Sequence, residues 1–250
     1  MPLLSLPNEI LLIIASSLNQ TDTNSLLLTN LYFASLLTPR LKALSLLDRD
    51  SWTALQWAVS NRSESHVLAL LQHGTNIDFL PADSDTVRVH QTALQLAAGS
   101  ADKTIVRLLL VHGADVSARS PHEATALHMA VRSGCAECVT LLLQYGADVS
   151  AVDEDERTPL LWAVGFRFAG IVKVLLESGA DAGAVCKGFK PLHWAVQLVD
   201  GAVIRMLLQH GADPMARDEV NGWTPLERLV RFGANSDEGK DAARALSGKE

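Results

Sequence analysis

The sequence predicts an all-α solenoid of about six stacked helix–turn–helix repeats, preceded by a small three-helix domain. Three observations predict the solenoid. A Thr-x-Leu motif (once Lys-x-Leu) recurs along the chain, beginning at Thr53, Thr92, Thr125, Thr158, Lys190 and Thr224. A turn glycine follows the first five motifs, at Gly74, Gly113, Gly146, Gly179 and Gly211. The spacing is the third observation, because 21 residues separate motif and glycine in all five copies.

The rest of the repeat varies in length. From each turn glycine to the next motif the distance is 18, 12, 12, 11 and 13 residues. A packed helix cannot gain one residue without rotating its buried face by about 100°. A surface loop, by contrast, can double in length at a cost of about 0.6 kcal/mol. We therefore expect the constant part to be helical and the variable part to be a loop.

The third copy illustrates the local chemistry of one unit. Thr125 is a candidate N-cap for a short helix, and Gly134 ends that helix. A leucine-rich second helix follows and stops at Gly146, the left-handed residue expected at a helix C-terminus. In the next two copies Pro159 and Pro191 occupy the first helical turn, where a missing N–H costs little. Each unit is predicted to be a pair of short antiparallel helices that is stable only when stacked on its neighbours.

This unit resembles the ankyrin repeat in its period of about 33 residues and in its two motifs. The segments Lys190-Pro-Leu-His-Trp-Ala195 and His210-Gly-Ala-Asp213 are close to the family consensus. The resemblance covers about residues 48–235 and implies a domain of ankyrin repeats over 48–250 that binds a protein on its concave side. The last copy loses its leucine-rich second helix and ends in Asp237-Glu-Gly-Lys240 and a short polar helix, so we expect a truncated polar cap there.

Residues 1–47 do not fit the repeat and predict three short amphipathic helices. The order Leu-Pro-x-Glu-Ile-Leu and then Asp-x-x-x-Leu resembles an F-box. In that family the helices dock on the small adaptor subunit of cullin–RING (SCF-type) ubiquitin ligases, and the rest of the chain selects the substrate. The resemblance implies that the adaptor is contacted by Leu6, Pro7, Ile10, Leu11, Ile14 and Leu28. The alternative is that this apolar stripe only caps the open end of the solenoid.

Composition and charge disfavour several kinds of partner. The net charge is −7 and no basic stripe is present, whereas nucleic acids and anionic membranes are bound through clustered Lys and Arg. The apolar run at residues 10–14 is far shorter than the ~20 residues of a membrane span. Three cysteines are too few for a disulfide framework. We expect a cytoplasmic or nuclear protein.

No constellation in the sequence calls for a metal, a cofactor or a catalytic centre. Cys135 and Cys138 form the only C-x-x-C pair, lack the second pair of a zinc site, and are interpreted as packing residues. The acidic run at residues 153–156 is interpreted as a solvated hairpin tip. Five of the eight histidines fall at repeat positions, where hydrogen bonding within the repeat explains them: His73, His112, His128, His193 and His210.

Partner-binding side chains are expected on the hairpin tips and on the exposed face of the first helices. Mapped by register, these positions are His122, Arg132, Tyr145, Arg157, Phe166, Phe189, Gln197 and Trp223. Exposed rings at such positions suggest contact, since aromatic residues and Arg dominate interface hot spots. By contrast, Trp57, Trp162 and Trp194 share one register on the first helix and are expected to fill the core between units.

The sequence therefore predicts a non-enzymatic binding protein, and most specifically a substrate-recruiting adaptor of a cullin–RING ligase. Two alternatives remain open. One is a plain scaffold or inhibitor whose N-terminal helices only cap the stack. The other is a small-molecule binder or an unorthodox enzyme that uses the groove around Trp162 and Trp194. A long open groove favours a protein partner, whereas a closed apolar pocket with convergent polar groups favours a small ligand.

Overall fold

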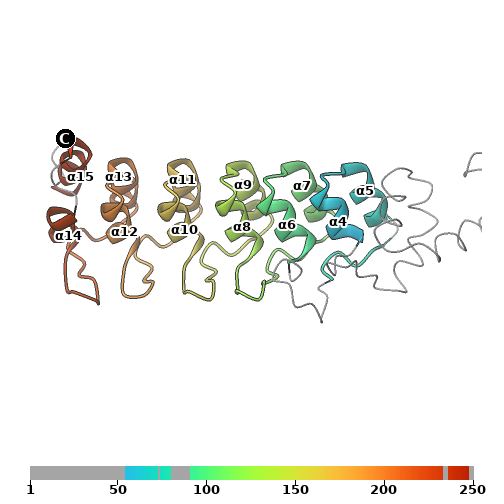
Figure 1. The fold of residues 1–250 in the computed structure, drawn as a ribbon, viewed down its shortest axis with the longest axis horizontal. Coiled ribbons are helices and arrows are strands. Elements are labelled where there is room, and N and C mark those ends of the chain that lie inside the picture. The colour runs from blue at the N-terminus through green and yellow to red at the C-terminus, as the bar shows by residue number, and fades with distance from the viewer. Residues whose placement is uncertain (1–53, 73, 80–90, 233–235, 248–250) are drawn as a thin grey trace, which may run out of the picture. The chain divides into compact units, whose positions relative to one another are not determined.

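Short helices follow one another in pairs along the chain (Figure 1). The computed structural model describes residues 54–72, 74–79, 91–232 and 236–247. Within these ranges the helix pairs are, in chain order, α4 (Ala54–Ser60) and α5 (Glu64–Gln72), α6 (Ala93–Gly99) and α7 (Lys103–Val111), α8 (Ala126–Arg132) and α9 (Ala136–Gln144), α10 (Pro159–Gly165) and α11 (Ala169–Glu177), α12 (Pro191–Gln197) and α13 (Gly201–Gln209), and α14 (Pro225–Phe232) and α15 (Asp237–Ser247). The chain divides into two units, residues 1–121 and 122–250.

The sequence motifs begin and end these helices as predicted. Thr92 caps α6: its side-chain oxygen accepts the backbone N–H of Gln95 at 3.2 Å, and Gln95 Oε1 accepts the N–H of Thr92 in return. Pro159 and Pro191 open α10 and α12. Gly146 follows α9 with a φ of +87°, the left-handed conformation that glycine adopts without steric cost. The constant part of the repeat is therefore helical, and the variable part is loop.

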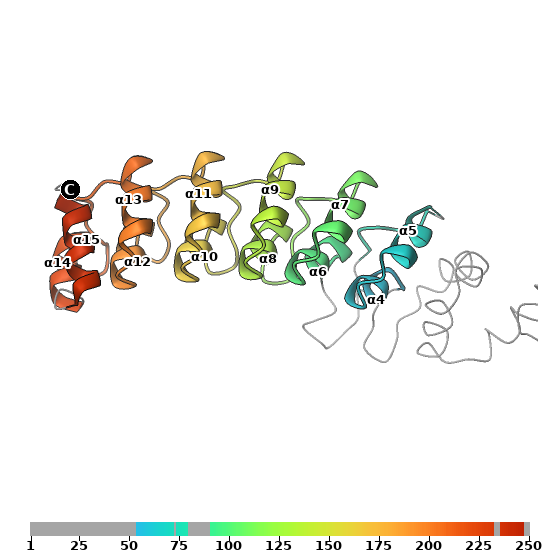
Figure 2. The ribbon, with the colours of Figure 1, turned by 90° about the horizontal axis from the view of Figure 1, so that it is seen from above.

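In the unit that begins at residue 122, the helix pairs stack in two layers (Figures 1 and 2). The first helices α8, α10, α12 and α14 pack side by side, as do the second helices α9, α11, α13 and α15. Between the layers lie fully buried leucines: Leu127, Leu142, Leu160, Leu175 and Leu192. Burying each of them contributes about 1.5–3 kcal/mol. Stacking therefore supplies the stability that these short helices lack when isolated.

The fourth residue of the motif ties four of the repeats to chain beyond the second helix. In four copies a Gln or His side chain reaches a backbone carbonyl there. The contacts are Gln56 to Gln91, Gln95 to Ala118, His128 to Arg157 and His193 to Ala216, at 2.7–3.1 Å. His112 and His210 bond instead to a carbonyl of their own helix. The predicted role of these four histidines in repeat hydrogen bonding is confirmed, and His73 lies outside the described residues.

The C-terminal repeat is a complete helix pair: the polar helix expected at this end is present, and the repeat is not truncated. Its second helix, α15, has 11 residues, against nine in α13, and it packs on α13 and α14. The buried positions of this helix are Gly239 and Ala242 rather than leucines, in agreement with its polar sequence. The outer side of α14 keeps Leu226 and Val230 exposed, so this end of the stack is not wholly polar.

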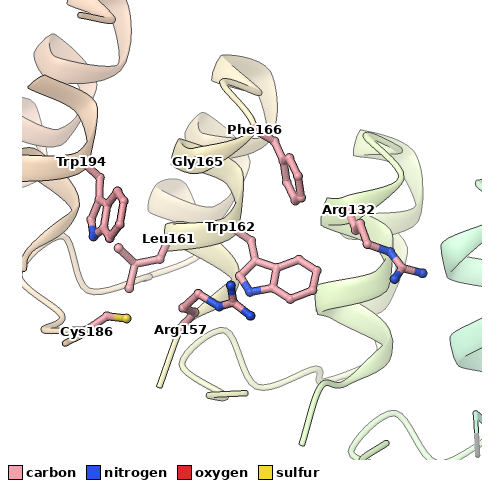
Figure 3. A pocket seen from close by; sticks show the side chains of 8 residues that line it. All are labelled: Arg132, Arg157, Leu161, Trp162, Gly165, Phe166, Cys186 and Trp194. Atoms are coloured by element: carbon pink, nitrogen blue, oxygen red, sulfur yellow. The ribbon is translucent and has the colours of Figure 1, made fainter. Parts of the chain in front are cut away.

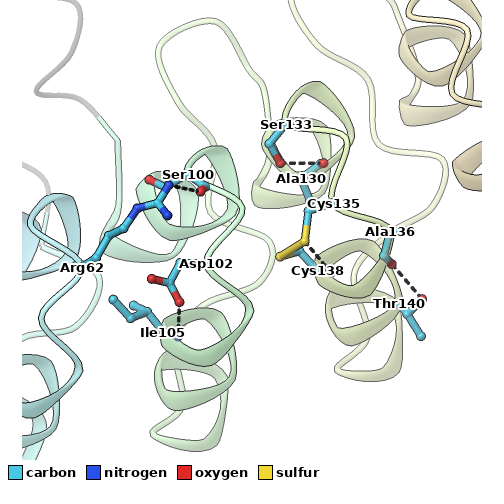
Figure 4. The surroundings of a disulfide bond; sticks show 10 residues. All are labelled: Arg62, Ser100, Asp102, Ile105, Ala130, Ser133, Cys135, Ala136, Cys138 and Thr140. Atoms are coloured by element: carbon cyan, nitrogen blue, oxygen red, sulfur yellow. Dashed lines mark hydrogen bonds between the residues drawn. A yellow bond between two sulfur atoms is a disulfide. The ribbon is translucent and has the colours of Figure 1, made fainter.

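A disulfide joins Cys135 and Cys138 at the start of α9 (Figure 4). Cys138 is fully buried, as its interpretation as a packing residue requires, but the bond between the two sulfurs was not expected. Cys135 is the N-cap of α9, and its sulfur accepts the backbone N–H of Cys138 at 3.2 Å. Asp102 and Asp200 occupy the same position before α7 and α13, where their carboxylates accept the equivalent N–H. The side chains of an N-cap residue and of the third helical residue meet on one turn, which brings the two sulfurs together.

The N-terminal segment lies outside the described residues, which begin at residue 54. The F-box-like domain over 1–47, with docking through the six side chains from Leu6 to Leu28, therefore stays a prediction.

Candidate functional site

The hairpin between α9 and α10 is organised around the carboxylate of Asp153. Its Oδ1 accepts the backbone N–H groups of Asp155 and Arg157, both at 2.9 Å. Its Oδ2 accepts Arg157 Nε and the indole N–H of Trp162, also both at 2.9 Å. The expectation of a solvated acidic tip is wrong for Asp153, whose side chain is 2% exposed, because these four donors replace water. The carboxylate thus holds both Arg157 and Trp162 in place.

The charges of this hairpin reflect those contacts. Burial by itself raises the pKa of Asp153, but the hydrogen bonds from the backbone of Arg157, from Trp162 and from the Arg157 guanidinium outweigh burial and hold this pKa below its ordinary value. At the tip, a hydrogen bond from Lys187 of the next hairpin and the nearby charge of Arg157 lower the pKa of Asp155. Arg157 therefore lies between two ionised carboxylates.

Beside this hairpin, a cavity of about 350 Å³ opens along α8, α10 and α12 (Figure 3). It is lined by Arg132, Arg157, Leu161, Trp162, Gly165, Phe166, Cys186 and Trp194. Half of these residues are exposed to solvent, namely Arg132, Arg157, Gly165 and Phe166. The cavity is therefore an open groove in the surface, and we call it the α10 groove.

Two aromatic rings of the α10 groove, Trp162 and Phe166, belong to a longer row that begins at the buried His128. His128 meets Trp162 with 5.5 Å between ring centroids, Trp162 meets Phe166 at 6.0 Å, and Phe166 meets Phe168 at 5.7 Å. The guanidinium carbon of Arg157 lies 5.3 Å from the centroid of the Trp162 ring, within cation–π range. Phe166 is 47% exposed although it is a large apolar residue. Such a row is a surface suited to contact with a partner.

The tryptophans of the shared register do not lie in the core. Trp57, Trp162 and Trp194 are half-buried, and the latter two form walls of the α10 groove. Their register was expected to fill gaps between stacked units, but those gaps are closed by leucine, valine and alanine side chains one position away, such as Ala163 and Ala195. The indoles are left at the edge of the stack.

A second cluster lies where α12 meets α14. The guanidinium carbon of Arg228 is 4.6 Å from the centroid of the Phe189 ring, and its Nη2 donates to Gln197 Oε1 at 2.7 Å. Arg231 covers the Trp223 ring with 4.7 Å between guanidinium carbon and centroid. The predicted residues Phe189, Gln197 and Trp223 are thus packed against arginines of the last repeat.

The predicted binding residues therefore fall into three groups. Arg132, Arg157 and Phe166 come together in the α10 groove, while Phe189, Gln197 and Trp223 belong to the second cluster. The remaining two line neither. His122 pairs with Glu154 of the next hairpin at 2.7 Å, and Tyr145 is the 44% exposed C-cap of α9.

Sequence reasoning did not place Leu161, Cys186 or Arg228 at a site. A signal for Leu161 was available, because it breaks the Gln-or-His pattern at the fourth position of the motif. No comparable signal marks Cys186, whose buried thiol donates to the carbonyl of Asp155 and has a pKa raised by that burial. Cys186 reaches the groove through tertiary packing, which the sequence pattern does not predict.

In the described part of the chain, no three His, Cys, Asp or Glu side chains are grouped to hold a metal ion. None of the helices described is long and apolar enough to cross a membrane.

Comparison with known proteins identifies the repeat. A family model for ankyrin repeats (3 copies) matches residues 79–153 and 146–218, which together exceed half of the chain. Among solved structures, the ankyrin repeat domain of Bcl-3, described as a unique member of the IkappaB protein family, is 31% identical with a TM-score of 0.75. That match covers 89% of this chain and 97% of that chain. No curated protein matches the sequence. With its helix pairs, capping motifs and turn glycines, this chain belongs to the ankyrin-repeat family.

Proposed function

We propose that this protein acts by binding alone and that the α10 groove holds part of a partner protein. Ankyrin repeats are protein-interaction modules, and the chain carries them over most of its length. The observation that carries the proposal is the lining of the groove, where exposed Arg132 and Phe166 flank the indoles of Trp162 and Trp194. Tryptophan and arginine are the residues most enriched at the energetic centres of protein interfaces.

The shape of the groove favours a protein over a small molecule. A small-molecule site encloses most of its ligand and directs a few polar groups into it. Half of the groove lining is exposed instead, and the row of rings from Trp162 to Phe168 continues along the surface. The alternative of a small-molecule binder or an unorthodox enzyme is therefore the weaker one.

Affinity capture with the full chain tests this proposal. We expect the Phe166→Asp variant to lose partners that the wild-type chain retains, because a charge would be placed on an apolar contact. Val111→Asp is the matched control, since Val111 is 63% exposed at the end of α7 and lies outside the groove. Partners kept by both variants would show that the groove is not the binding surface.

For the N-terminal segment we propose docking on the adaptor subunit of a cullin–RING ligase, which makes the chain a substrate-recruiting adaptor of the cytoplasm or nucleus. This proposal is supported by the motif that begins at Leu6 and Pro7. A substrate held in the α10 groove would then be modified because it is kept at high effective concentration near the ligase. A plain scaffold with an N-terminal cap is the alternative.

A pull-down with the purified ligase adaptor separates these roles. The intact chain is compared with a Leu6→Asp/Ile10→Asp double variant, and thermal denaturation checks that both are folded. Binding that is lost only in the variant supports the ligase role. A folded wild-type chain that does not bind the adaptor leaves a scaffold.

A further inference from the structure

The α10 repeat differs from other repeats at one residue of the groove lining. The fourth residue of the motif reaches a backbone carbonyl in four other copies, through Gln56, Gln95, His128 and His193. In the α10 repeat this residue is Leu161, which has no polar atom to make that bond and lines the cavity instead. Leu161 therefore makes this part of the lining apolar, near Cys186 and Trp194 (Figure 3).

The charged lining of the groove has one sign. Two of its eight residues are arginines, and none is a carboxylate. The charge of Arg157 is already satisfied, since it pairs with Asp153 at 2.9 Å and with Asp155 at 2.8 Å. Arg132 is exposed and forms no ion pair with any described residue. The available positive charge at the groove is therefore the guanidinium of Arg132, on the side where α8 borders it (Figure 3).

From these two features we infer the chemistry of the partner. We propose that the α10 groove takes an extended protein segment in which a large apolar side chain fills the cavity against Leu161, Trp162 and Trp194, and in which an adjacent Asp or Glu pairs with Arg132. This inference rests on the proposed function and adds the identity of the recognised segment. A cavity of about 350 Å³ has room for one large side chain and part of its neighbour. A guanidinium pairs with a carboxylate in a two-pronged geometry, so Arg132 also sets the orientation of the segment.

Selection from a library of random linear peptides displayed on phage, with the full chain as target, tests the proposal. We expect the recovered peptides to share an apolar residue with Asp or Glu one or two positions away. Their affinity should fall by about tenfold or more in Arg132→Glu, since a charged hydrogen-bonded pair becomes a repulsion. Replacing the peptide carboxylate by Lys should restore binding to that variant. Arg244→Glu, an equal change of charge on the exposed side of α15, should leave affinity unchanged.

A second variant tests the apolar part of the site. Leu161→His installs the side chain that the repeat uses at His128 and His193, so it should fold while obstructing the cavity. We expect it to lose the peptides without losing thermal stability.

Peptides that lack an acidic residue, or that bind Arg132→Glu as well as wild type, would overturn the inference. So would the absence of any selected peptide while captured partners still depend on Phe166, and in that case the proposed function would stand. A wild-type dimer that Arg132→Glu dissociates would assign the groove to a second copy and overturn it as well.

Discussion

The indole N–H of Trp162 donates to the buried Oδ2 of Asp153 at 2.9 Å, whereas the equivalent N–H of Trp194 is buried with no acceptor among the described residues. The two tryptophans stand four residues after Thr158 and after Lys190, so they share one register. Asp153 stands five residues before Thr158, and Val185 holds that position in the next hairpin. The Trp194 indole therefore lacks an acceptor because its hairpin carries Val185 at the position where the preceding hairpin carries Asp153.

Removing the two indole N–H groups should have opposite effects on stability. Trp162→Phe takes a donor from a buried carboxylate and should lower the free energy of unfolding by about 1.5–3 kcal/mol. Trp194→Phe removes a donor that is unpaired in the folded state. Apart from the effect of the smaller ring, this change should leave the free energy of unfolding unchanged or raise it. Urea denaturation of both variants measures the difference. Equal losses would show that ring volume, rather than the hydrogen bond, decides the outcome.

The positions of the helices were predictable because a constant spacing within the repeat indicates packed helices. A constant interval of 21 residues between motif and glycine admits only packed helices, and Thr92 and Gly146 cap them as their chemistry requires. The groove was only half predictable. Arg132, Arg157 and Phe166 follow from register, whereas Leu161 in the same lining departs from the Gln-or-His pattern of four other repeats.

Other features depended on contacts that spacing does not encode. Asp153 looked like one of four solvated acids, and only the folded hairpin turns four donors toward it. The number of cysteines does not predict the Cys135–Cys138 disulfide, because that bond depends on the capping geometry at the start of α9. The local sequence predicts which residue caps a helix. Which side chain contacts that residue depends on the folded structure.

Giving Trp194 an acceptor should stabilise the protein. Val185→Asp places a carboxylate at the position of Asp153, and Val185 is 45% exposed, so little apolar burial is lost. We expect a gain of about 1 kcal/mol in the free energy of unfolding. The control is the same substitution in a Trp194→Phe background, where no donor remains. An equal effect in both backgrounds would show that the new carboxylate does not reach the indole.

The burial of His193 should make stability depend on pH. Burial lowers the pKa of His193 below its ordinary value of about 6.5, so the unfolded chain takes up the proton first. The stabilising effect of the neutral ring is complete above pH ~6.5 and is lost as the pH falls below it. His193→Gln keeps the bond to the Ala216 carbonyl, as Gln95 does to Ala118, but cannot titrate. Thermal unfolding against pH should therefore be flatter in this variant, and a profile as steep as that of the wild type would show that His193 does not cause the dependence.

The two cysteines of the disulfide should respond differently to replacement by serine when a reducing agent keeps all thiols free. Cys135 is an N-cap, and serine accepts the N–H of residue 138 at least as well as sulfur, so Cys135→Ser should be neutral or stabilising. Cys138 is fully buried beneath the helix turn, and Cys138→Ser places a hydroxyl there at a cost of about 1–3 kcal/mol. Urea denaturation compares the variants, and repeating it under oxidising conditions isolates the disulfide, which both replacements remove. If Cys135→Ser proves the more harmful of the two when reduced, the side chain of residue 135 stabilises α9 by something other than capping.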